Sequence, residues 1–406
     1  MKRIDFPEEE LLSVYRDYGV IRKRDRDDNF NKPSEDLGPY QLVEPGDLAI
    51  NKMKAWQGSL GVSPYRGIVS PAYFVYHARH NELPGYLHYL LRSDPYATGF
   101  LTISKGIRIN QWDVDPDHLA QLPIPLPSLS EQAEIVAFLD RETAKIDALV
   151  EEQRRLIELL KEKRQAVISH AVTKGLNPDA PMKDSGVEWL GEVPSHWAIA
   201  KFPSAIDFQE GPGILAVDFH DEGVPLLRVA GAQSRWASLD GCNFLDPAKV
   251  QSRWDHFRLE LGDLVISGSA SMGTVCEVGA ATVGAIPYTG LIRLRPRNNG
   301  ATRDYIRALV SSSLFFTQID MLKAGATIQH FGPIHLRQMI VTLPPKEEQE
   351  KIAVYVEAEH TRFDALLEQA SAAITLLQER RAALISAAVT GKIDVRAANT
   401  QQAEAA

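Results

Sequence analysis

The sequence has few cysteines, no long apolar run and no excess of positive charge. Its two cysteines, Cys242 and Cys276, do not form a C-x-x-C motif, which argues against a disulfide framework or a zinc site. No stretch approaches about eighteen uninterrupted apolar residues, and the first residues lack the apolar core of a signal peptide. We therefore expect a cytoplasmic protein that does not enter the membrane. The net charge of −9 is spread along the chain, which excludes strong nucleic-acid binding by bulk charge alone.

Motifs that carry catalysis are also missing. The sequence has no G-x-G-x-x-G, no P-loop and no H-E-x-x-H pair among its 11 histidines. No glutamate is followed two residues later by lysine, so half of the common nuclease motif is absent. The segment Asn177-Pro-Asp-Ala lacks the aromatic residue of the Asn-Pro-Pro-Tyr box of amino-methyltransferases. We therefore expect a non-enzymatic chain that binds no metal or cofactor itself.

A long internal repeat is present instead. Residues 126–174 can be laid without a gap on residues 343–391 by adding 217 to each number. The two stretches share Leu-Pro, Glu-Gln, Asp-Ala-Leu and Ala-Val-Thr at matching positions. A period this long excludes a solenoid and indicates two copies of a whole domain with its helix. Weaker sequence similarity extends into the globular parts that precede the two helices, where the residue offset varies slightly. This indicates that the two copies share core elements and differ in their loops.

Each copy predicts one long helix with readable ends. Prolines precede the first helix, Ser128 and Glu131 fit a capping box, and glycines follow both helices at Gly175 and Gly391. Apolar residues recur at coiled-coil spacing, so we expect the two helices to pair through this stripe rather than to be unrelated surface helices. The predicted spacer residues are Leu139, Ile146, Leu149, Leu160 and Val167 in the first helix, and Val356, Phe363, Leu366, Leu377 and Leu384 in the second.

These observations divide the chain into six parts. We expect a first globular domain at 1–127, a spacer helix at 128–176, a linker at 177–186, a second globular domain at 187–343, a second spacer helix at 344–392 and a disordered tail at 393–406.

The two globular domains differ at their start. The second has residues 187–225 before Leu226-Leu-Arg-Val229, whereas the first has only ten residues before the similar Leu11-Leu-Ser-Val14. We expect the first domain to lack about thirty residues that its sibling has, and to be the less stable of the two because a strand edge or core face is left uncovered.

Candidate DNA-reading residues lie in loops. In the first domain they are Lys52, Lys54, Trp56 and Gln57 after one predicted strand, and Lys105 and Arg108 before the proline-rich helix entry. Lysines can hold phosphates, and amides can read adenine edges. In the second domain the matching places carry Ser267, Ser269 and Ser271, and Lys323, Gln329 and His330.

Ordinary solvated turns remain an alternative for each of these loops. Arg293, Arg295 and Arg297 alternate along another predicted strand, and there we expect the solvent face of an edge strand.

The layout resembles the specificity subunit of type I restriction–modification systems. The resemblance rests on the duplicated helix motif and on Gly-Val-Glu-Trp-Leu-Gly-Glu-Val-Pro-x-x-Trp, which ends at Trp197 and opens the second domain. It implies an α+β fold in which two target-recognition domains are joined by two long antiparallel coiled-coil helices, with pseudo-twofold symmetry.

The resemblance also implies partners. They are double-stranded DNA, two methyltransferase subunits and a restriction/translocase subunit. Catalysis then belongs to the partner subunits, which would hold S-adenosylmethionine, ATP and magnesium. A coiled-coil scaffold or adaptor that binds no DNA is the alternative. Copurification of a methyltransferase subunit would distinguish the two.

Overall fold

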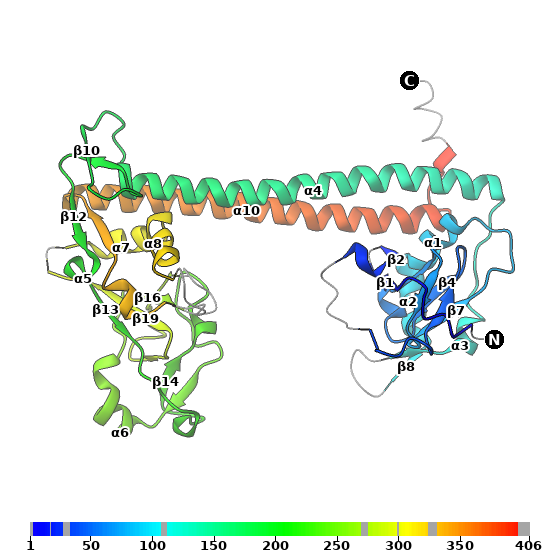
Figure 1. Cartoon of the computed structure of the whole chain (residues 1–406), viewed down its shortest axis with the longest axis horizontal. Coiled ribbons are helices and arrows are strands. Elements are labelled where there is room, and N and C mark those ends of the chain that lie inside the picture. The colour runs from blue at the N-terminus through cyan, green and yellow to red at the C-terminus, as the bar shows by residue number, and fades with distance from the viewer. Residues whose placement is uncertain are drawn as a thin grey trace. The chain divides into compact units, whose positions relative to one another are not determined.

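A computed structural model describes residues 3–16, 18–26, 33–106, 112–268, 275–298, 300–323 and 331–396. The chain divides into two compact units (Figure 1). Unit 1 combines Met1–Arg155 with Ser371–Ala406, and unit 2 comprises Leu156–Ala370. Both cysteines are free. No helix within the described residues is long and apolar enough to cross a membrane.

The globular part of unit 1 is built from short strands followed by helices. Its central sheet has three antiparallel strands in the order β5-β4-β7. Strand pairs β1-β2, β3-β6 and β8-β9 surround this sheet. The elements are β1 (Leu12–Tyr15), β2 (Gly19–Arg22), β3 (Gln41–Val43), β4 (Leu48–Asn51), β5 (Leu60–Val62), β6 (Gly67–Val69), β7 (Tyr73–Tyr76), α1 (Pro84–Arg92), α2 (Asp94–Thr102), β8 (Ser104–Lys105), β9 (Asp113–Val114) and α3 (Pro116–Leu119).

The globular part of unit 2 has the same plan with additions. Its central sheet has four strands in the order β13-β19-β16-β17, and a second sheet has the order β15-β14-β18. The elements are β10 (Met182–Asp184), β11 (Glu192–Pro194), β12 (Ala198–Lys201), α5 (Phe202–Ala205), β13 (Ile206–Glu210), β14 (Val224–Leu227), β15 (Asn243–Leu245), α6 (Pro247–Lys249), β16 (Leu264–Ser267), β17 (Val275–Glu277), β18 (Ile286–Pro287), β19 (Leu291–Pro296), α7 (Arg303–Val310), α8 (Ser313–Lys323), α9 (Pro333–Leu336) and β20 (Ile340–Leu343).

The weak sequence similarity between the two copies falls on the same structural elements in both units. Strands β5-β4-β7 correspond to β17-β16-β19, and helices α1, α2 and α3 correspond to α7, α8 and α9. Leu11, before β1, bridges Ile68 in parallel, just as Leu226 in β14 pairs in parallel with Ile286 in β18. The fold class predicted from the sequence is therefore shown by the structure: two α+β globular parts and one pair of long helices.

The long helices are α4 (Leu129–Lys174) and α10 (Lys346–Val389). The predicted capping box is formed, since the Ser128 amide donates to Glu131 Oε2 at 3.0 Å and the Glu131 amide donates to Ser128 Oγ at 3.3 Å. Gly175 and Gly391 follow the helices with φ of 78° and 72°, conformations that favour glycine and end a helix.

Most of the predicted spacer residues, here called the seam residues, are buried or half-buried where α4 packs on α10. Leu139, Ile146, Val356 and Phe363 are at most 5% exposed, and Leu160, Val167, Leu366, Leu377 and Leu384 are half-buried. Leu149 is 51% exposed, so its assignment to the seam is wrong. Val150, at 7%, takes the place instead. The physical reason is spacing: buried Thr143, Ile146 and Val150 alternate at three and four residues, and Leu149 falls one position outside this stripe.

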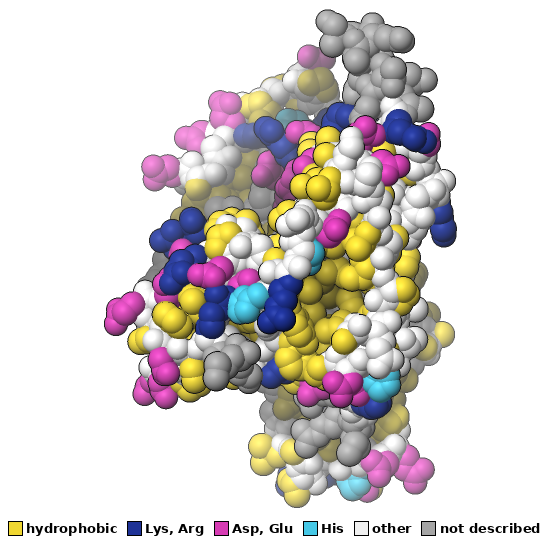
Figure 2. Space-filling view, turned by 90° about the vertical axis from the view of Figure 1, so that its right-hand side faces the viewer, with side chains coloured by type: hydrophobic (Ala, Val, Ile, Leu, Met, Phe, Trp, Pro, Cys, Tyr) yellow, Lys and Arg dark blue, Asp and Glu magenta, His cyan; other side chains and the backbone are white. Residues whose placement is uncertain are grey.

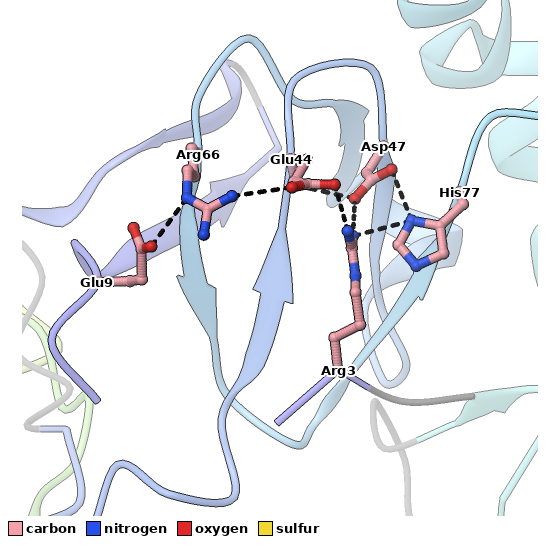
Figure 3. A network of polar contacts seen from close by, with 6 residues as sticks. All are labelled: Arg3, Glu9, Glu44, Asp47, Arg66 and His77. Atoms are coloured by element: carbon pink, nitrogen blue, oxygen red, sulfur yellow. Dashed lines mark hydrogen bonds and ion pairs between the residues drawn. The ribbon is translucent and has the colours of Figure 1, made fainter. Parts of the chain in front are cut away.

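The turn before β4 in unit 1 and the turn before β16 in unit 2 share one backbone anchor, but the ion pairs around them differ. In unit 1 the Glu44 amide donates to Asp47 Oδ2 at 2.8 Å, and Arg3, Arg66 and His77 complete an ion-pair network (Figure 3). In unit 2 the Glu260 amide donates to Asp263, whose carboxylate is paired with Arg295.

We expected Arg293, Arg295 and Arg297 to line the solvent face of an edge strand, and this expectation is wrong in part. The strand that carries them, β19, lies between β13 and β16, and Arg293 is only 7% exposed. Burial lowers the pKa of Arg293. Arg295 is engaged with Asp263 rather than free in solvent.

Candidate nucleic-acid interface and helix docking contacts

The two candidate loops of the first domain lie side by side. The Val114 amide donates to the Lys52 carbonyl at 3.0 Å, which joins the exit of β4 to β9. The rings of Trp56 and Trp112 meet with centroids 5.2 Å apart. Trp56 also donates from Nε1 to the Met53 carbonyl at 3.1 Å, which fixes its ring in the loop. Two segments some fifty residues apart in sequence thus form one surface.

The lysines on this surface are held to different degrees. Lys52 Nζ donates to the Pro71 carbonyl at 2.7 Å and lies 4.9 Å from the centre of the Phe74 ring, so it is already engaged. Lys54 is exposed. Lys105 Nζ lies 3.2 Å from Asp115 Oδ2.

Asp115 is an acidic residue of this surface. Its hydrogen bonds with Lys105 and His118 hold the pKa of its carboxyl at about 2. A pocket of about 480 Å³ lies beside Lys105 and is lined by Leu101, Ser104, Lys105, Gly106 and Trp112.

Of the remaining candidates in the first domain, Gln57 is half-buried. Arg108 lies outside the described residues.

In the second domain the described residues that flank the two candidate loops are in contact. The Phe331 amide donates to the Gly268 carbonyl at 2.9 Å, which is the equivalent of the contact between Val114 and Lys52. A Cβ at Gly268 would lie 2.3 Å from the Phe331 carbonyl oxygen, so only glycine fits this close approach. Ser267 is fully buried. Lys323 ends α8. The candidates Ser269, Ser271, Gln329 and His330 lie outside the described residues.

In the first domain, helix α1 packs on strands β2 and β5 through His88. A Cβ at Gly19 or Gly61 would approach the His88 ring at 2.5 Å and 3.3 Å, so these glycines make room for it. Burial, with the nearby charge of Arg92, lowers the pKa of His88 to about 3. In unit 2 the corresponding helix uses Arg307, which pairs with Glu277 at 2.6 Å.

A buried glutamine joins each globular part to the start of the helix that follows it. Gln132 accepts from the Leu83 amide at 2.9 Å and donates to the Pro127 carbonyl at 2.9 Å. In unit 2 Gln349 accepts from the Thr302 amide at 2.7 Å and donates to the Pro344 carbonyl at 2.9 Å. Both glutamines are at most 2% exposed. The repeated Glu-Gln pair of the sequence thus supplies one docking contact in each unit.

A buried tyrosine joins each globular part to the end of the other long helix. Tyr86 donates to the Pro125 carbonyl at 3.0 Å and also lies 3.4 Å from the Val389 carbonyl, at the end of α10. Its counterpart Tyr305 lies 3.5 Å from the Val172 carbonyl near the end of α4. Burial raises the pKa of Tyr86 to about 12 and also raises that of Tyr305.

Sequence reasoning did not single out the docking residues or Trp112. The glutamines were visible in the repeat, and Tyr86 and Tyr305 stand at matching places in the weaker similarity, so a signal existed for both. The internal repeat gives no signal for Trp112, because the loop residues differ between the two units.

Known proteins share this organisation. No protein-family model matches the chain. The EcoKI specificity subunit of Escherichia coli K12, a type I restriction enzyme subunit, is 22% identical over 411 residues, covering 96% of this chain and 84% of the relative. The putative MjaX specificity subunit of Methanocaldococcus jannaschii is 25% identical and covers 89% and 81%. This chain is a homologue of type I specificity subunits.

Other comparisons agree with this homology. The match to the MjaVIII specificity subunit of M. jannaschii, at 23% identity, spans 70% of this chain and 65% of that subunit. A chain solved in a study of complex assembly and conformational transition of the type I R-M system has a TM-score of 0.68, with 96% of this chain and 94% of that chain covered at 18% identity. The HsdS subunit from Thermoanaerobacter tengcongensis gives 0.50, with 97% and 94% covered. These structures share the fold of this specificity-subunit homologue.

Proposed function

We propose that this chain is the DNA-recognition subunit of a type I restriction–modification complex. The observation that carries the proposal is the duplication of an entire docking arrangement. Each unit has a sheet-and-helix part that is fixed to the long helices by one buried glutamine and one buried tyrosine. One scaffold carrying two different loop surfaces suits a DNA site with two different halves.

The acidic chain must hold DNA through local surfaces. In the first domain Lys54 and the Trp56–Trp112 pair offer a phosphate contact and an apolar platform near groove edges. A scaffold that binds no DNA gives no reason for the loops of the two copies to differ while the docking residues repeat.

The long helices offer matched apolar positions for partners. Leu159 in unit 2 is 52% exposed, and Leu376, its equivalent in unit 1, is 65% exposed. Leu176 and Ile393, which lie just beyond the ends of α4 and α10, form a second matched pair at 39% and 36%. A hollow of about 600 Å³ lies beside Leu176. Two equal sets of contacts suit two copies of one partner, which we take to be methyltransferase subunits, with a restriction/translocase subunit joining them.

The reactive chemistry then belongs to those partners. We expect S-adenosylmethionine, ATP and magnesium to bind there, and this chain to be non-catalytic. Its place of action is the cytoplasm, where the chromosome lies.

Mapping of methylated adenines tests the function. Cells that carry the partner subunits should methylate a two-part site only when this chain is present. Copurification should recover a methyltransferase subunit at two copies per chain. The proposal fails if methylation is unchanged without the chain, or if the chain purifies with partners but binds no DNA.

A further inference from the structure

Three segments of the second globular domain meet at one end of the sheet β15-β14-β18. Strands β14 and β18 run parallel, so the residues that follow them, Arg228 and Tyr288, leave the sheet side by side. Strand β15 runs antiparallel to β14, and its first residue, Asn243, lies opposite Leu226. The pairing of the strands therefore brings the side chains of Arg228, Tyr288 and Asn243 together, although they are distant in the sequence.

The guanidinium of Arg228 is held by several of its neighbours. Its Cζ lies 4.3 Å from the centre of the Tyr288 ring and 5.6 Å from the centre of the Phe219 ring, both within the range of cation–π contacts. Its Nη1 donates to Asn243 Oδ1 at 2.9 Å. The two rings also contact each other, with centroids 6.2 Å apart. Two rings and one hydrogen bond thus orient the guanidinium, and within the described residues its Nε and Nη2 donate no hydrogen bond.

The charge of Arg228 is not neutralised by any carboxylate of the described residues, and the side chain is half-buried. Carboxylates pair instead with other arginines of this domain, namely Arg235, Arg258, Arg293, Arg295, Arg303 and Arg307. On the face drawn in Figure 2, Lys and Arg side chains are likewise interspersed with Asp and Glu side chains. The oriented guanidinium of Arg228 is therefore available to an acceptor from outside the chain.

The Arg228 cluster borders the flanks of the candidate loops of the second domain. Two residues after Tyr288, the Gly290 carbonyl accepts from the Gly268 amide at 2.8 Å, at the exit of β16. The Gly268 carbonyl accepts in turn from the Phe331 amide. One short turn, residues 288–290, thus connects the cluster to the segments from which both candidate loops start or end.

The internal repeat carries a different residue at the place of Arg228 in the first domain. Arg228 belongs to Leu226-Leu-Arg-Val229, and the similar Leu11-Leu-Ser-Val14 has the buried Ser13 at this position. Phosphates are the same in both halves of a DNA site, whereas the bases differ. A contact residue that differs between two copies of one element therefore suits a base better than a phosphate.

We propose that Arg228 reads a guanine in the DNA half-site that the second domain binds. Its free nitrogens donate to O6 and N7 of guanine, which stand side by side in the major groove and match the planar donors of arginine. Phe219, Tyr288 and Asn243 are positioning residues that hold these donors in place. The inference rests on the proposed DNA-recognition function and adds to it one residue and the base that it reads.

Replacement by lysine separates base reading from charge. Arg228→Lys keeps the positive charge but lacks the planar pair of donors. Methylated adenines should be mapped in cells that carry the partner subunits with either the wild-type chain or this variant. The variant should prefer one guanine of one half-site about tenfold less or weaker still, while every other position stays the same. Arg253→Gln, which removes an exposed arginine of the same domain, is the control and should leave all positions unchanged.

The role of the rings is read at the same guanine. Tyr288→Leu removes the ring that lies 4.3 Å from the guanidinium and should relax the preference for this guanine in the same direction as Arg228→Lys. Tyr288→Phe keeps the ring and should restore the preference. A loss of stability alone would lower methylation at all sites equally and would not select one base.

A modified base tests the contact without any change in the protein. The purified complex of the wild-type chain with its methyltransferase subunits should bind duplexes in which 7-deazaguanine replaces each guanine of the site in turn. Because 7-deazaguanine lacks the N7 acceptor but keeps its base pairing, one replacement should weaken binding by about tenfold. The complex with Arg228→Lys should bind that duplex and the unmodified duplex equally well.

Three results would overturn the proposal. The first is a wild-type chain that directs methylation while Arg228→Lys leaves every position of the site unchanged. The second is uniformly weaker binding with a smaller salt dependence and the same base preference, which would make Arg228 a phosphate contact. The third is wild-type binding that no 7-deazaguanine replacement weakens. Methylation of a two-part site by the wild type is read separately, so these results leave the recognition function intact.

Discussion

Arg381 forms a bidentate ion pair with Asp147: its Nε donates to Oδ1 at 2.9 Å and its Nη2 donates to Oδ2 at 3.2 Å. Unit 2 contains the same contact, since Arg164 Nη1 lies 2.6 Å from Asp364. Adding 217 to Asp147 and Arg164 gives Asp364 and Arg381. Each unit thus holds one copy of an ion pair between α4 and α10, and the pairing runs antiparallel in both.

Charge reversal at Arg381 should loosen the helix pair locally. Arg381→Glu places two carboxylates together, and we expect the free energy of opening in unit 1 to fall by about 1 kcal/mol or less, because the pair is partly exposed. Amide exchange along 139–150 measures it. The matched variant Arg164→Glu should act in unit 2 only. If the double variant Asp147→Arg with Arg381→Asp does not recover stability, the contact is not an ion pair in solution.

Removal of a buried glutamine should cost more. Gln132→Ala leaves the Leu83 amide without its acceptor, which we expect to cost about 1–3 kcal/mol. Gln349→Ala should have the same effect at Thr302. Chemical denaturation of the two variants gives the magnitudes, and exchange shows the location. Gln153→Ala, on the same helix, is the control. Equal losses in all three variants would contradict a docking role.

Unit 1 should lose stability in acid through His88. Its pKa in the folded state is about 3, well below the ordinary 6.5, so the unfolded chain binds a proton first as pH falls. Stability is therefore full above about 6.5 and declines toward pH 3, by up to about 1.4 kcal/mol per pH unit. His88→Gln should flatten this slope in exchange measurements on unit 1, whereas the exposed His170 replaced by Gln should not. An unchanged slope in His88→Gln would mean that other groups carry the acid sensitivity.

DNA binding should depend on the lysines of the first domain. Replacing Lys52 and Lys54 with Ala should weaken binding and reduce the slope of log K against log salt by up to about one unit per lost phosphate contact. Lys54→Ala alone should carry most of the effect, because Lys52 is held by the Pro71 carbonyl. Base preference in the other half-site should stay the same. A changed preference there would show that the domain assignment is wrong.

Length of the helix pair should set the gap between the half-sites. Seven residues inserted after both Gln153 and Ala370 keep the seam in register and lengthen each helix by about 10.5 Å, or about three base pairs of DNA rise. Methylation mapping should show a longer gap between unchanged half-sites. Altered half-sites with an unchanged gap would refute this ruler model.

The sequence alone predicted the long helices and the repeat. Local chemistry decides these features: the capping box at Ser128, the glycines Gly175 and Gly391 at positive φ, and apolar spacing over many turns. Such signals need only near neighbours in the chain. The seam was predicted less well at Leu149, since a shift of one residue depends on how the two helices meet.

Only the tertiary structure decided which distant segments lie together. The contacts of Gln132 with Leu83 and of Tyr86 with Val389 join residues far apart in the chain, so no local pattern reports them. Arg293 was expected on an edge strand, but β13 pairs beside it and buries it. Its burial depends on a strand about eighty residues earlier. Local propensity and capping are thus written into the sequence, whereas edges, docking contacts and burial follow from the pairing of remote segments.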